Sequence, residues 1–119
     1  MDEYFKSLLT QISESYNFLK EMKDAPGDLD IINVQQAKIQ GLIKVLCNKI
    51  VALHYESDDF SELLKAGNTY LENYDFKDII DTYQLYSKDV MRIKNIRILI
   101  ISSLEETKLI SKIQSMLQH

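Results

Sequence analysis

Helix-breaking residues are scarce in this sequence, and that scarcity restricts the fold more than any other feature. The 119 residues include one proline and three glycines, and Pro26 and Gly27 stand together in the segment APGD. Proline ends a helix before it and glycine permits the turn, so residues 25–28 form the one strong turn signal. Long helices are therefore predicted on both sides of this turn.

Apolar residues recur at steps of three and four along the chain, which is the spacing of one helix face. The predicted helices cover residues 4–25, residues 29–54 and a third segment that starts at Asp59, the expected N-cap, and runs to about residue 74. A fourth segment, residues 75–117, would be about 64 Å long if it were one helix. We predict an all-α fold, an antiparallel bundle of three to four long helices in one domain (1–119), with the last helix the longest.

The fourth segment contains the densest apolar run of the chain, Ile98–Ile101, within NIRILIISSLEE. On a helical wheel its apolar residues form two stripes that point to roughly opposite sides. The first stripe consists of Ile79, Tyr83, Tyr86, Val90, Ile93, Ile96, Ile100 and Leu104, and the second of Leu109, Ile110, Ile113, Met116 and Leu117.

Three structures are consistent with these two stripes. The helix breaks at Ser102–Ser103, where Ser103 and Glu106 match a capping box, and a short last helix folds back onto the bundle. Alternatively, the helix continues, and its last three turns present an exposed apolar surface of the kind that usually marks a partner site. The third alternative is that IRILII forms a β-strand, which its β-branched content allows, although no partner strand is evident.

If the apolar surface is exposed, it predicts a protein-binding site on the last helix. The candidate partner-binding residues are then Ile98, Leu109, Ile113, Met116 and Leu117. An amphipathic helix of a partner would lie in such an apolar groove, anchored at three- and four-residue steps.

The distribution of charge indicates which segments are neighbours. Residues 1–30 carry a net charge of −4, residues 31–55 of +3, residues 56–81 of −6 and residues 82–119 of +3. This alternation suits antiparallel neighbours, although exposed ion pairs stabilise a fold by only about 0–1 kcal/mol each. The net charge of −4 argues against general binding to nucleic acid or to anionic membranes.

Other features of the sequence indicate a cytoplasmic protein without membrane insertion. Cys47 is the only cysteine, so no internal disulfide can form. No apolar run approaches the roughly 20 residues that a membrane span needs. The N-terminal MDEYFKSLLTQ has acidic residues where a secretory signal is basic, and it lacks a long apolar centre.

No catalytic, cofactor-binding or metal-binding pattern is found, and we do not expect an enzyme. The histidines are His54 and His119. Cys47 and His54 would lie about 10.5 Å apart along one helix, too far for a thiolate–imidazole pair. The acidic cluster ESDDFSE lacks the interleaved glycine of a calcium loop and is typical of a helix start.

The order of these segments resembles the flagellar export chaperones of the FlgN and FliT kind. The resemblance lies in a first helix, an acid-rich turn, GDLDIINVQQAKIQGLIKVL, and a long final helix carrying RIKNIRILIISSLEE. In FlgN-like sequences the last helix tends to carry an asparagine, then aliphatic residues, then SLE. The matching residues here are Asn95, Ile96–Ile101, Ser103, Leu104 and Glu105.

The resemblance implies a cytosolic chaperone that holds a helical segment of an exported flagellar protein, in part through apolar residues of its last helix. Two other functions remain open: a structural subunit of a helical complex, in which case the chain would dimerise through the same stripe, and a small immunity or antitoxin-like bundle.

Overall fold

Helices α1 (Glu3–Glu21) and α2 (Leu29–Ala52) run antiparallel along most of the bundle's length. The computed structural model describes residues 2–118. The turn between the two helices contains Gly27, whose φ of 88° suits glycine, and its N–H donates to the carbonyl of Ser87 at 3.0 Å. The predicted turn at residues 25–28 is therefore present, and it also contacts the segment that leads into α5.

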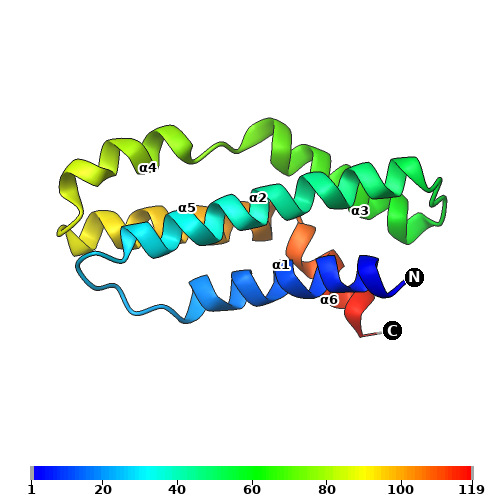
Figure 1. Cartoon of the computed structure of the whole chain (residues 1–119), viewed down its shortest axis with the longest axis horizontal. Helices are drawn as coiled ribbons and strands as arrows, with labels where there is room; N and C mark the ends of the chain where they lie inside the picture. The colour runs from blue at the N-terminus through cyan, green and yellow to red at the C-terminus, as the bar shows by residue number, and fades with distance from the viewer. Residues whose placement is uncertain (1, 119) are drawn as a thin grey trace.

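The remaining helices are α3 (Asp58–Asn73), α4 (Lys77–Tyr83), a 3₁₀ turn η1 (Gln84–Tyr86), α5 (Val90–Glu106) and α6 (Leu109–Leu117). In the half of the molecule that holds both termini, α1 and α2 pack with α3 and α6; in the other half they pack with α4 and α5 (Figure 1). The bundle is thus two four-helix layers stacked end to end, with α1 and α2 shared.

The all-α prediction is confirmed, because residues 2–118 contain helices and no strand. IRILII lies within α5, so the β-strand alternative is wrong. The prediction that the last helix is the longest is also wrong. The longest helix is α2, with 24 residues, and the fourth segment is divided into α4, η1, α5 and α6.

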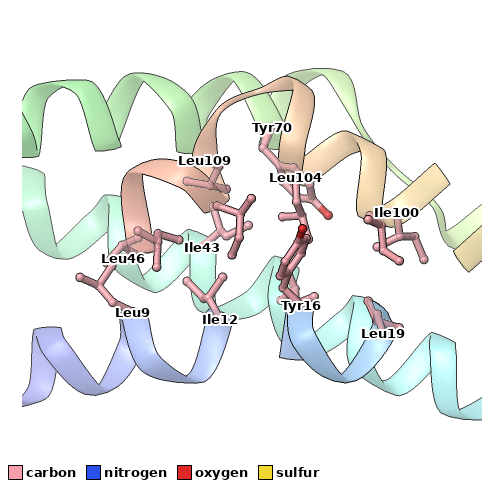
Figure 2. Packing of buried hydrophobic residues seen from close by; sticks show 14 of the residues in the cluster. Leu9, Ile12, Tyr16, Leu19, Ile43, Leu46, Tyr70, Ile100, Leu104 and Leu109 are labelled. Carbon is pink, nitrogen blue, oxygen red and sulfur yellow. The ribbon is translucent and has the colours of Figure 1, made fainter. Parts of the chain in front are cut away.

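One continuous apolar core joins the two layers (Figure 2). The stripe predicted for the first helix is buried, and Tyr16 and Leu19 of α1 lie near Leu104 and Ile100 of α5 in Figure 2. Gly67 on α3 allows a close approach to α2, since a Cβ at this position would lie 2.6 Å from the Cys47 sulfur. A side chain at position 67 would therefore have to displace the Cys47 sulfur where α3 packs against α2.

The break between α5 and α6 lies at Thr107–Lys108, five residues after the predicted Ser102–Ser103. Ser103 does not cap a new helix; it is buried inside α5 and donates its hydroxyl to the carbonyl of Ile100 at 2.6 Å. Lys108 adopts the left-handed conformation, φ 63°, that ends many helices. A short last helix then folds back, as the first alternative proposed, but from a later residue.

Two other helix ends show how local hydrogen bonds set the boundaries. His54, at φ 53°, follows α2, and the N–H groups of His54 and Tyr55 donate to the carbonyls of Val51 and Ile50, the pattern of a Schellman motif. Helix α3 is capped by Ser57, whose hydroxyl accepts from the N–H of Phe60, rather than by the predicted Asp59.

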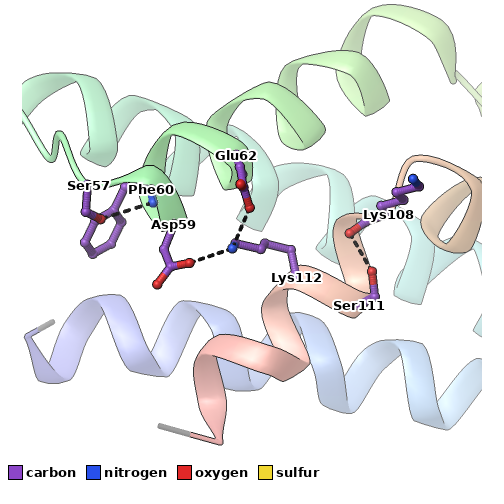
Figure 3. Close-up of polar contacts among 7 residues, drawn as sticks. All are labelled: Ser57, Asp59, Phe60, Glu62, Lys108, Ser111 and Lys112. Atoms are coloured by element: carbon purple, nitrogen blue, oxygen red, sulfur yellow. Dashed lines mark hydrogen bonds and ion pairs between the residues drawn. The ribbon is translucent and has the colours of Figure 1, made fainter.

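Ion pairs between helices join an acidic segment to a basic one, as the alternation of charge predicted. Lys112 on α6 contacts Asp59 and Glu62 on α3 at 2.6 and 2.7 Å (Figure 3). Arg97 on α5 pairs with Asp24 after α1, and Lys49 on α2 with Asp2; both of these pairs also join segments of opposite net charge. Charge thus assists in selecting neighbours within the bundle.

Candidate protein-binding surface

The structure divides the five predicted partner-binding residues between core and surface. Leu109, Ile113 and Met116 are buried, and Leu117 is partly buried against the core. They are buried because α6 folds back between α1 and α3. The exposed apolar end that these residues were expected to form is therefore absent from α6, and we correct the prediction for them. Ile98 alone of the five is exposed.

Ile98 belongs to a partly apolar strip on the outer side of α5. Met91, Ile98 and Leu99 have 62%, 43% and 47% of their surface exposed. Helical spacing puts Met91, Asn95, Ile98 and Ser102 in one line with Leu99 beside it, opposite the buried Ile93, Ile96 and Ile100. We call Met91, Asn95, Ile98, Leu99 and Ser102 the α5 outer strip.

The α5 outer strip explains the apolar run Ile98–Ile101. Ile100 and Ile101 are buried in the bundle, whereas Ile98 and Leu99 are directed to solvent. Four consecutive apolar residues cover all sides of a helix, so a helix packed on one side must expose part of such a run. The run therefore serves both the core and an outer surface.

Two contacts hold the start of the helix that carries the strip. The carboxylate of Asp89 accepts from the N–H groups of Met91 and Arg92, which caps the start of α5. The Arg92 guanidinium lies 3.4 Å from the ring centroid of Tyr86. A partner would thus meet a surface that is already ordered, which reduces the entropy lost on binding.

Met91 and Leu99 were not among the predicted site residues, although the sequence contained a signal for both. Met91 lies seven residues before Ile98, two helical turns away on the same face. Leu99 is inside the apolar run and outside the core stripe that ends in Ile100 and Leu104.

A groove of about 500 Å³ lies between α3 and α6, near the lysine contacts in Figure 3. Three of its hydroxyl groups bond within their own chain segment: Thr69, Thr107 and Ser111 donate to the carbonyls of Lys65, Ser103 and Lys108. The Lys112 ammonium is shared by Asp59 and Glu62, and these hydrogen bonds raise its pKa. The polar groups of the groove therefore stabilise the contact between α3 and α6.

The described residues offer little reactive chemistry. Burial raises the pKa of the Cys47 thiol to about 11, so the thiol is protonated near neutral pH and is a poor nucleophile. His54 lies at the end of α2, and His119 lies outside the described residues. Between residues 2 and 118 there is no group of three or more His, Cys, Asp or Glu side chains placed to hold a metal. In the same range, no helix combines the length and apolar character needed to cross a membrane.

Comparison with known proteins finds no relative of this chain. No family model, no curated protein and no solved structure matches the chain.

Proposed function

We propose that this chain is a non-enzymatic, protein-binding helical bundle that holds an amphipathic helix of another protein on the α5 outer strip. One observation carries the proposal: Met91, Ile98 and Leu99 are exposed along just over two turns of one ordered helix. Exposed apolar residues at helical spacing on one helix face are the feature that helix-in-groove recognition uses.

Within that class, we propose an export chaperone of the FlgN or FliT kind, acting in the cytoplasm on a flagellar client. The residues that carry the resemblance support this choice, since Asn95 and the aliphatic residues after it include Ile98 and Leu99 of the strip. A chaperone of this kind needs an exposed apolar surface and no catalytic group.

The test is capture of the client from the native cells with a tagged chain, followed by binding of the purified pair. We expect an exported flagellar protein to co-purify and its helical C-terminal segment to bind the purified chain. Ile98→Asp should weaken binding at least about tenfold, because it places a charge at the centre of an apolar contact. Phe18→Asp, an equally polar change at an exposed residue on α1, should bind as the original does.

Both variants must first give the circular dichroism and melting behaviour of a folded bundle. An exported protein that binds Ile98→Asp and Leu99→Asp with unchanged affinity would contradict the proposed surface. Recovery of the tagged chain with only its own untagged copies would contradict the chaperone proposal and favour a structural subunit.

A further inference from the structure

Helix α2 has a second apolar face, on the side opposite the core. Its buried face consists of Ile32, Ile39, Ile43, Leu46 and Ile50. On the opposite side Ile31, Val34 and Val45 have 41%, 63% and 41% of their surface exposed. Ala37 and Gly41 lie between them and are exposed as well. We call Ile31, Val34, Ala37, Gly41 and Val45 the α2 outer strip.

A helix that is apolar on two sides is normally covered on both. Among residues 2–118, no element covers the α2 outer strip, since its members stay exposed beside all the described helices. The strip extends over about 21 Å, or four helical turns. These dimensions suit one further helix laid along α2, which runs along most of the bundle in Figure 1.

Gly41 supports the same conclusion independently. A glycine inside a helix lowers stability by about 0.5–1 kcal/mol relative to alanine. A Cβ at Gly41 would meet nothing within 4 Å, so packing inside this chain does not require the glycine. With Ala37 one turn earlier, it leaves a shallow place on α2 where a second helix backbone can approach closely.

The charges beside the strip indicate what kind of helix fits. Lys38 and Lys44 flank it, and neither forms an ion pair with another residue in the described part of the chain. From residue 31 to its end α2 contains no acidic residue. A second copy fits poorly, because antiparallel pairing about Gly41 would set Lys38 against Lys44 of the other copy.

We propose that the α2 outer strip docks an acidic amphipathic helix of another protein. The partner's apolar side would cover Val34, Gly41 and Val45, and its Asp or Glu side chains would meet Lys38 and Lys44. The proposal does not rest on the α5 outer strip, because α2 and α5 are different helices and each strip faces away from the core.

The test is an NMR titration of the ¹⁵N-labelled full chain with two synthetic helical peptides of about 20 residues, long enough to cover the strip. Both carry the same Leu and Ala stripe, flanked by Glu in one and by Lys in the other. We expect the Glu peptide to cause saturable shifts at the amides of the α2 outer strip, and the Lys peptide to cause none.

Variants separate the apolar and charged contributions. Val34→Glu should weaken binding at least about tenfold, and the double change Lys38→Glu with Lys44→Glu should make the chain prefer the Lys peptide. Gly41→Ala should bind more weakly although the bundle itself becomes more stable. Ile98→Asp should bind the Glu peptide as the original chain does, which separates this surface from that of the proposed function.

Four outcomes would overturn the proposal: equal binding of both peptides, shifts centred on α5, no saturable shift up to about 1 mM peptide, or self-association of the chain that Val34→Glu abolishes. The last outcome would assign the α2 outer strip to a second copy.

Discussion

Arg97 on α5 and Asp24, just after α1, form a bidentate ion pair that links α5 to the end of α1. Arg97 Nε lies 2.8 Å from Asp24 Oδ1 and Nη2 lies 3.2 Å from Oδ2, and Nη1 donates to the carbonyl of Leu19 at 3.0 Å. Both side chains are largely shielded from solvent. The planar guanidinium suits this geometry, since it binds a carboxylate through two parallel donors.

Arg97→Ala should therefore lower the free energy of unfolding by about 1–3 kcal/mol, because it leaves Asp24 and the Leu19 carbonyl without their shared donor. Urea unfolding followed by circular dichroism measures the change. Arg92→Ala is the matched control, since Arg92 pairs with Asp89 at 3.4 Å in an exposed position, where about 0–1 kcal/mol is expected. Equal losses in both variants would show that the shielding of Arg97 has no energetic effect.

Replacing Gly41 or Gly67 by alanine should change the stability of the fold in opposite directions. Gly67→Ala should lower stability by about 1–2 kcal/mol, because its Cβ would lie 2.6 Å from the Cys47 sulfur in a packed core. Gly41→Ala should raise stability by about 0.5–1 kcal/mol, because the site is open. Thermal melts of both variants measure the two effects.

A double-mutant cycle identifies the cause at Gly67. In a Cys47→Ala background the sulfur is absent, so Gly67→Ala should be much less destabilising there than in the original chain. If the loss is the same in both backgrounds, contact with Cys47 is not its cause.

His54 and Lys108, the two left-handed residues that end α2 and α5, should be replaceable by glycine with a gain in stability. His54 and Lys108 have φ values of 53° and 63°, a conformation that a Cβ disfavours. His54→Gly and Lys108→Gly should each raise the free energy of unfolding by about 0.5–1 kcal/mol. Urea denaturation checks this, and a loss of stability in either variant would indicate that its side chain has a stabilising role.

Tyr70 should be replaceable by phenylalanine without loss. Its hydroxyl is the buried side-chain polar atom of the described region that has no hydrogen-bond partner, and burial raises its pKa to about 12. Removing an unsatisfied hydroxyl is neutral or stabilising by up to about 1 kcal/mol. Tyr55→Phe is the control and should be destabilising, because the Tyr55 hydroxyl donates to Asp2 at 2.9 Å. A clear loss with Tyr70→Phe would mean that a bound water or the Ser103 hydroxyl satisfies the group.

Stability should fall in acid partly through Asp2. Hydrogen bonds from the Phe5 N–H and the Tyr55 hydroxyl, with the nearby Lys49 ammonium, lower the pKa of this carboxyl below its usual 3.8. A depressed pKa contributes stability that is complete above the unfolded-state pKa and is lost as the pH falls through the folded-state pKa. Asp2→Asn keeps a capping side chain but cannot ionise, so the stability gap between the two proteins should be constant near pH 7 and close below about pH 4. A gap that persists at pH 2 would exclude Asp2 ionisation as its source.

Much of this fold was determined by local sequence. The α1 stripe from Phe5 to Leu19, the turn at Pro26–Gly27 and the all-helical class follow from residue periodicity and from the shortage of breakers. These are short-range properties, because they depend on side chains within a few turns of one another. The alternation of charge also predicted which segments form ion pairs, since the sign of each segment is read directly from its residues.

Only the tertiary structure decided which of the apolar faces became core. Leu109 and Ile98 are equally apolar in sequence, yet one is buried and the other is exposed. The difference arises at Lys108, where a left-handed residue turns α6 back against α1 and α3, whereas Ile98 lies on the side of α5 opposite its neighbours. Burial depends on contacts between residues far apart in sequence, and periodicity within one helix carries no information about them.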